Sequence, residues 1–133
     1  MPDFEHIKIL FVDDQTDTIK NYIEYLRRYC YVVDTAVNGI DAYKKYHEFK
    51  PDIILLDINM PKMDGMELLK RIRKEDSVTR IIMFTAQNES SLTQKALELG
   101  TTQYLHKPVS RVKLKGALQK AKKEMVELKK GLL

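Results

Sequence analysis

Residues 51–65 read Pro51-Asp52-Ile53-Ile54-Leu55-Leu56-Asp57-Ile58-Asn59-Met60-Pro61-Lys62-Met63-Asp64-Gly65. The four apolar residues before Asp57 form a short unbroken run, which is typical of a strand buried on both faces of a sheet. Turn-forming Pro and Asp-Gly follow, and the residues after them have helical spacing. The pattern therefore places Asp57 at the carboxyl end of a central strand, the edge where open α/β sheets bind ligands.

The composition limits the class of protein. A chain of 133 residues with 44% hydrophobic and 32% charged residues is expected to form one globular domain. No apolar run is long enough to cross a membrane, and one cysteine excludes an internal disulfide, so we expect a cytoplasmic protein. The net charge of +4 reflects a Lys/Arg-rich segment at residues 111–130. Because no aromatic residues interleave these lysines, we expect no direct nucleic-acid binding.

Strand and helix patterns alternate along the whole chain. Buried strands are predicted at residues 7–12, 31–36, 80–84 and 103–106 in addition to the opening stretch, and helices at 15–29, 40–49, 66–73, 89–99 and from about 110 onward. Thr16 or Asp17 is expected to cap the first helix, and Gly100 to end the fourth. This alternation predicts a parallel sheet covered by helices on both faces.

The last predicted helix carries apolar residues at heptad spacing. They are Leu114, Leu118, Ala121, Met125, Leu128 and Leu132. We expect the first half of this helix to cover the sheet and the second half to extend past it. The second half is then a frayed end, a dimer contact or a stub toward an output domain.

Polar residues follow four of the five predicted strands. These residues are Asp13, Asp14, Asp57, Thr85 and Lys107. Parallel strands bring their ends to one rim, where three carboxylates repel each other unless cations neutralise them. Lys107 supplies one positive charge, and an all-oxygen ligand set that leaves room for water and phosphate favours Mg²⁺ for the remainder.

This group of residues predicts phosphoryl chemistry. A carboxylate beside Mg²⁺ and a lysine can attack phosphorus and form an aspartyl phosphate, and Thr85 can donate a hydrogen bond to a phosphoryl oxygen. Each residue alone is also explained as a strand end or a helix cap. Because carboxylates, a hydroxyl and an ammonium occur together at the four strand ends, phosphoryl transfer is favoured over these separate structural explanations.

The sequence resembles the receiver domain of two-component response regulators. The matching motifs, in family order and spacing, are Ile9-Leu10-Phe11-Val12-Asp13-Asp14, residues 57–65, Phe84-Thr85-Ala86 and Tyr104-Leu105-His106-Lys107-Pro108. The resemblance covers about residues 6–126. It implies a flavodoxin-like (βα)5 fold, a doubly wound five-stranded parallel sheet of order 2-1-3-4-5. Residues 1–133 would then be a single receiver domain, with 127–133 as a helical extension or linker stub.

The resemblance also implies a role for each site residue. Asp57 would be the phosphoacceptor, assisted by Lys107 and Thr85, and Thr85 and Tyr104 would form the switch. Mg²⁺ would be held by Asp13, Asp14, Asp57 and the backbone carbonyl of Asn59, and the phosphoryl group would contact Asn59 and Ala86.

The implied function is signalling. A sensor histidine kinase or phosphotransfer protein would phosphorylate Asp57, and the surface of the fourth helix, fifth strand and fifth helix would then act on a downstream protein, a fused output domain or a second copy of the chain. The domain would catalyse only its own phosphorylation and dephosphorylation. Among departures from the family pattern, Val109 replaces a common Phe after Lys107-Pro108, and Thr101-Thr102 replace small residues.

Three alternatives remain open from the sequence. The chain can be the N-terminal part of a longer regulator, cut within its last helix. An aspartyl-phosphate phosphatase is disfavoured because such hydrolases use a second acid two residues after the nucleophile, where this chain has Asn59. A flavin carrier is disfavoured because Asp13-Asp14 would repel the phosphate of the cofactor.

Overall fold

A computed structural model describes residues 7–29, 31–87 and 89–131, so Cys30 lies outside the described residues. The five strands are β1 (Lys8–Val12), β2 (Val32–Ala36), β3 (Ile53–Leu56), β4 (Arg80–Thr85) and β5 (Gln103–His106). They form one parallel sheet in the order β2-β1-β3-β4-β5. The predicted flavodoxin-like order is therefore confirmed.

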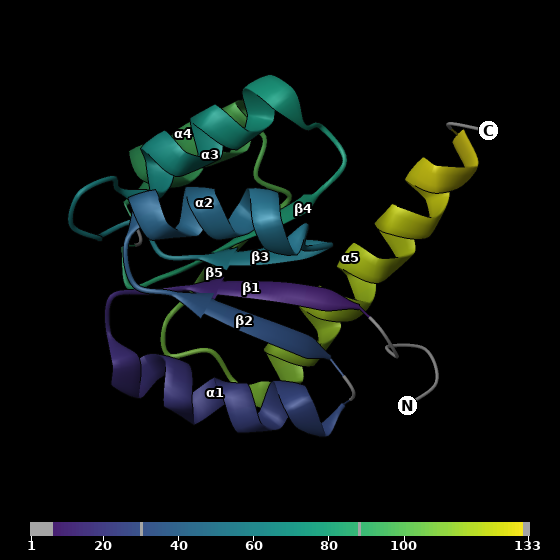
Figure 1. Ribbon diagram of the computed structural model, residues 1–133, viewed down its shortest axis with the longest axis horizontal. Coiled ribbons are helices and arrows are strands. Elements are labelled where there is room, and N and C mark those ends of the chain that lie inside the picture. The colour runs from purple at the N-terminus through teal and green to yellow at the C-terminus, as the bar shows by residue number, and fades with distance from the viewer. Residues whose placement is uncertain (1–6, 30, 88, 132–133) are drawn as a thin grey trace.

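The five helices cover both faces of this sheet. They are α1 (Thr16–Arg28), α2 (Gly39–Phe49), α3 (Gly65–Glu75), α4 (Ser90–Leu99) and α5 (Arg111–Gly131). Figure 1 shows α1 and α5 on one face and α2, α3 and α4 on the other. Among the described helices, none has both the length and the apolar composition that a membrane crossing requires.

Strand alternation divides the core into two layers. In β1, Ile9 and Phe11 pack toward α1 and α5, whereas Leu10 and Val12 pack toward α2, α3 and α4. Every residue of β3 is fully buried. An apolar run without alternation is what a central strand needs when helices cover it on both sides.

The helix ends follow local backbone chemistry. Gly100 ends α4 with a positive φ of 106°, which confirms the predicted C-cap. The predicted cap of α1 was wrong, because Gln15 occupies the N-cap position and its side chain makes no capping hydrogen bond. The Gln15 amide instead donates to Asp13 Oδ1 at 2.9 Å, so the start of α1 is tied to the end of β1.

Helix α5 extends beyond the sheet, as its heptad spacing predicted (Figure 1). Leu114, Leu118, Ala121 and Met125 are buried in the layer shared with α1. Leu128 is only partly buried, and Leu132 lies outside the described residues.

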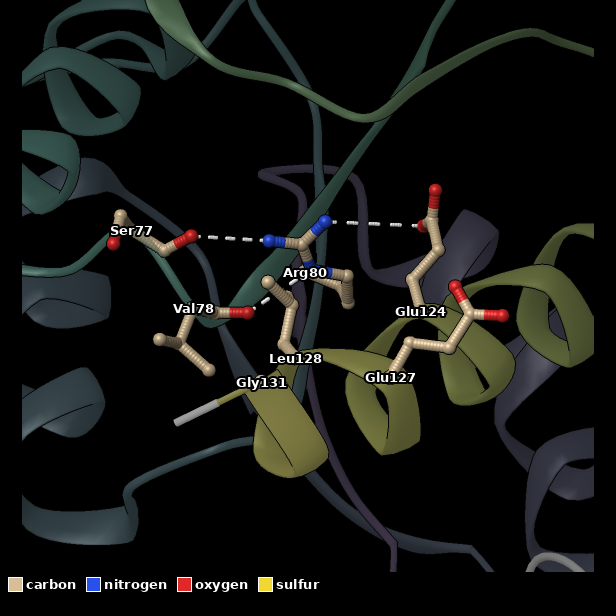
Figure 2. Close-up of a pocket in the computed structure, with 7 residues that line it drawn as sticks. All are labelled: Ser77, Val78, Arg80, Glu124, Glu127, Leu128 and Gly131. Carbon is tan, nitrogen blue, oxygen red and sulfur yellow. Dashed lines mark hydrogen bonds and ion pairs between the residues drawn. The ribbon is translucent and has the colours of Figure 1, made fainter. Parts of the chain in front are cut away.

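A groove of about 550 Å³ lies between the start of β4 and the distal part of α5 (Figure 2). The Arg80 guanidinium donates to the carbonyls of Ser77 and Val78 and lies 3.9 Å from a Glu124 carboxylate oxygen. This groove is at the amino end of β4, whereas the predicted site lies at the carboxyl ends of the strands. We therefore attribute the groove to the docking of α5 and not to the predicted chemistry.

Candidate functional site

Three carboxylates meet at the carboxyl edge of the sheet. Asp13 and Asp14 directly follow β1, and Asp57 directly follows β3. One ligand oxygen from each lies within 4.8 Å of the other two, and no other group of three acidic, His or Cys side chains does so in the described part of the chain. Asp13 and Asp57 are buried and Asp14 is exposed. The structure thus brings together the three acids that the sequence predicted.

Lys107 reaches this acidic group from the end of β5. Its Nζ lies 2.5 Å from Asp13 Oδ2 and 3.5 Å from Asp57 Oδ2. Its backbone amide donates to the carbonyl of Thr85 at 2.8 Å, which continues the pairing of β4 and β5. One ammonium facing three carboxylates leaves negative charge uncompensated, so a further cation is favoured at this edge.

The electrostatics of Asp13 support the same conclusion. Burial raises the pKa of Asp13, and hydrogen bonds from Lys107 and the Gln15 amide only partly offset that effect. The pKa of the Asp13 carboxyl therefore lies above its ordinary value. A buried carboxyl in this situation gains from a nearby cation, because the cation favours its ionised form.

The donor chemistry fits Mg²⁺. All three side chains offer hard carboxylate oxygens, and the exposure of Asp14 leaves that side of the group open to water and to a phosphoryl oxygen. Asn59 lies exposed in the loop two residues after Asp57. Its backbone carbonyl stays a predicted ligand.

The loop after β3 holds Asp57 in place. The Asp57 amide donates to the carbonyl of Val12 at 3.0 Å, and Asp57 Oδ1 accepts from the Ile58 amide at 2.8 Å. Gly65 packs directly against this turn, and a Cβ added there would lie 2.0 Å from the Asp57 carbonyl oxygen. Only glycine fits at residue 65 without displacing the backbone that carries the proposed acceptor.

The two predicted switch residues contact the same residue, Gln87. Thr85 is fully buried, and its hydroxyl accepts from the Gln87 amide at 3.3 Å. The Tyr104 hydroxyl donates to the Gln87 carbonyl at 2.5 Å. Burial raises the pKa of Tyr104 above its ordinary value. The loop after β4 thus connects the end of that strand to Tyr104 in β5.

Two residues that the sequence did not single out contact the site backbone. Nε2 of His106 lies 3.0 Å from the carbonyl oxygen of Ala86, one of the predicted phosphoryl-binding residues. The Tyr22 hydroxyl bonds to the backbone of Val109, two residues after Lys107. The helix predicted at residues 15–29 includes Tyr22, but the sequence does not show this contact, because the contact depends on how α1 meets the loop after β5.

Comparisons with known proteins agree on one family. The profile of the family described as "Response regulator receiver domain" matches residues 9–119. Chemotaxis protein CheY of Listeria monocytogenes is 38% identical over 120 residues, which cover 88% of this chain and 99% of that protein. The transcriptional regulatory protein PhoP of Bacillus subtilis is 42% identical over 104 residues, covering 77% of this chain but 43% of PhoP.

A solved structure with the same fold contains BeF3 and Mg²⁺. The CheX-CheY-BeF3-Mg²⁺ complex from Borrelia burgdorferi contains a chain that superposes with a TM-score of 0.80 at 33% identity. The match covers 86% of this chain and 87% of that one.

Proposed function

Because this chain belongs to the response regulator receiver domain family, we propose that it accepts a phosphoryl group on Asp57 and transmits that event through the α4-β5-α5 surface. Receiver domains are signalling domains, and phosphorylation on aspartate and Mg²⁺ binding are general in the family. The observation that carries the assignment to Asp57 is its position beside Asp13, Asp14 and the Lys107 ammonium.

The proposed reaction is a transfer from phosphohistidine to aspartate. A carboxylate oxygen of Asp57 attacks phosphorus, the phosphorus–nitrogen bond of the donor breaks, and its electron pair returns to the imidazole. Lys107 would move from Asp13 toward the transferred group and bind one of its oxygens, with the Thr85 hydroxyl and the Ala86 amide as further donors. Bound Mg²⁺ supplies the charge that lets the carboxylate and the phosphoryl group approach each other.

The Borrelia structure supports the ligand part of this proposal. That relative is seen with BeF3 and Mg²⁺, and trifluoroberyllate bound to a carboxylate oxygen has the tetrahedral shape and charge of an aspartyl phosphate. In this chain Asp13, Asp14, Asp57 and the Asn59 carbonyl are proposed to hold the metal. The phosphodonor is proposed to be a cytoplasmic sensor histidine kinase or a phosphotransfer protein.

The proposed output follows from the contacts of Gln87. A phosphoryl group that binds the Thr85 hydroxyl would break the hydrogen bond between that hydroxyl and the Gln87 amide. Gln87 would then be free to shift, and its carbonyl accepts the hydrogen bond from the Tyr104 hydroxyl. The change would therefore reach β5 and the neighbouring α4, where Leu97 is half exposed. A downstream protein or a second copy of the chain is the proposed reader, with no direct contact to nucleic acid.

A fused output domain is the second candidate, because the chain matches less than half of PhoP. The match to nearly all of the Listeria CheY favours a separate protein target. The coding sequence beyond Leu133 distinguishes the two. A phosphatase is a weaker alternative, since Asn59 offers no acid; steady hydrolysis of phosphomonoesters would revive it.

A spectroscopic experiment tests the proposal. Adding BeF3⁻ and Mg²⁺ is expected to shift the amide NMR signals around Asp57, Thr85 and Tyr104, whereas Asp57→Asn is expected to remove these shifts. Absence of shifts in the wild type, or equal shifts in the variant, would contradict the assignment of Asp57.

A further inference from the structure

Tyr22, in the middle of α1, makes two hydrogen bonds to the backbone of Val109 in the loop after β5. Its hydroxyl donates to the carbonyl of Val109 at 2.8 Å and accepts from the amide of the same residue at 3.2 Å. One hydroxyl thus satisfies both backbone polar groups of Val109, the N–H and the C=O, as a neighbouring strand would. Val109 itself is 4% exposed.

This contact fixes the chain immediately after Lys107. The Lys107 amide is held by the Thr85 carbonyl at 2.8 Å, and Pro108 has no N–H to offer. The next available donor is the Val109 amide, and it goes to Tyr22. The backbone that carries Lys107 is therefore held by the sheet on one side and by Tyr22 on the other.

The ring of Tyr22 supports the side chain of Lys107 as well. It packs edge-on against Phe84, with ring centroids 5.0 Å apart and an interplanar angle of 81°. Lys107 Nζ lies 5.8 Å from the centroid of the same Phe84 ring. Tyr22 and Lys107 also line one small hollow of about 250 Å³ together with Pro108.

We propose that Tyr22 is a positioning residue for Lys107, which holds the ammonium where it meets the phosphoryl group on Asp57. This inference rests on the proposed function. Without the hydroxyl, the backbone amide and carbonyl of Val109 both lose their hydrogen bonds to Tyr22, and the segment from Lys107 to Val109 loses its second fixed point. Small displacements of a catalytic group lower the rate strongly, because the reacting geometry is then reached less often.

The test compares Tyr22→Phe with Tyr25→Phe in the full chain. Tyr25 lies on the same helix and also donates a hydrogen bond to backbone, but to the Arg111 carbonyl at 3.2 Å and not to the loop carrying Lys107. Acetyl phosphate with Mg²⁺ serves as donor, and intact-mass spectrometry measures the rate. The saturating rate of Tyr22→Phe is expected to fall about tenfold, with Tyr25→Phe matching the wild type.

Mg²⁺ affinity separates positioning from general loosening. Isothermal titration with Mg²⁺ alone should show no weaker binding in Tyr22→Phe, because Lys107 is not a metal ligand. An unchanged rate in Tyr22→Phe, an equal loss in Tyr25→Phe, or weakened Mg²⁺ binding would overturn the inference. If the wild type takes up no phosphoryl group, both this inference and the proposed function are overturned. If the wild type is phosphorylated and Tyr22→Phe is phosphorylated equally fast, only the role of Tyr22 is overturned.

A measurement on the wild type is independent of how the variants fold. The Val109 amide is expected to exchange with deuterium slowly, like the amides of the sheet, because Tyr22 holds it. Exchange at the rate of an open loop would overturn the inference.

Discussion

The Lys107 ammonium lies 2.5 Å from Asp13, closer than its 3.5 Å approach to Asp57. Lys107 thus pairs with a proposed metal ligand and neutralises part of the charge that Mg²⁺ would neutralise. Mg²⁺ binding and the release of Lys107 from Asp13 are therefore expected to be coupled. Such a coupling would bring the ammonium to Asp57 when Mg²⁺ is bound.

Replacing Lys107 by Met should separate metal binding from phosphoryl transfer. Removal of the ammonium takes away a competitor for Asp13, so the Mg²⁺ dissociation constant is expected to fall. The phosphorylation rate is expected to drop by about 100-fold or more, because a donor to the transferred group is lost. Titration calorimetry and intact-mass kinetics measure the two effects, and weaker Mg²⁺ binding would contradict the coupling.

Asp14 should be a metal ligand whose loss leaves the fold intact, because its side chain is exposed at the edge of the acidic group. Asp14→Asn is expected to raise the Mg²⁺ dissociation constant more than about tenfold. Glu98→Gln, which removes the same charge from an exposed position on α4, is the matched control and should bind like the wild type. Equal effects of the two changes would point to net charge and not to ligation.

Two glycines should respond in opposite directions to alanine. At Gly65 a new Cβ would lie 2.0 Å from the Asp57 carbonyl oxygen, so Gly65→Ala is expected to lower the free energy of unfolding by about 3 kcal/mol. At Gly116 nothing lies within 4 Å, so Gly116→Ala is expected to raise it by about 0.5–1 kcal/mol through better helix propensity. Urea denaturation measures both, and a harmless Gly65→Ala would contradict the tight turn.

Asp76 should make folding depend on pH in acid. Burial acts to raise its pKa, but hydrogen bonds from Thr79, Tyr46 and the Val78 amide outweigh this and lower the pKa to about 2. Because the folded pKa lies below the ordinary value of 3.8, this contribution is full above about pH 4 and is lost as the pH falls toward 2.

The test of that prediction is the slope of the unfolding free energy between pH 4 and pH 2. Asp76→Asn is expected to be less stable at neutral pH and to show a shallower decline over this window. Glu98→Gln again provides a control with the same loss of charge. An unchanged slope in Asp76→Asn would show that other carboxyls dominate acid unfolding.

Much of the fold could be predicted because it depends on local patterns. The alternation of strand and helix patterns was sufficient for a parallel sheet covered on both faces, whereas the strand order came from the family resemblance. The polar residues ending the strands were sufficient for the acidic group. The helix caps were less predictable. The end of α4 at Gly100 could be predicted because glycine readily adopts the left-handed backbone conformation found there, but the start of α1 depends on a hydrogen bond from the Gln15 amide to Asp13.

Contacts between distant segments could not be predicted. Tyr22 lies in a segment that the sequence predicted only as a helix, and its two hydrogen bonds to Val109 arise only when α1 packs beside the loop after β5. The bond from the Tyr104 hydroxyl to the Gln87 carbonyl likewise depends on how β5 packs beside the loop after β4. Sequence spacing shows which residues reach the same edge of the sheet, but not which backbone groups their side chains contact there.

The central claim is that Asp57 is the residue that accepts the phosphoryl group. Its most direct test is the intact mass of the wild type and of Asp57→Asn after incubation with acetyl phosphate and Mg²⁺, followed by peptide mapping. The account predicts that the wild type gains one phosphoryl group at Asp57, and that neither Asp57→Asn nor the wild type without Mg²⁺ gains any. Equal phosphorylation of Asp57→Asn, or a wild type that stays unmodified, would contradict it.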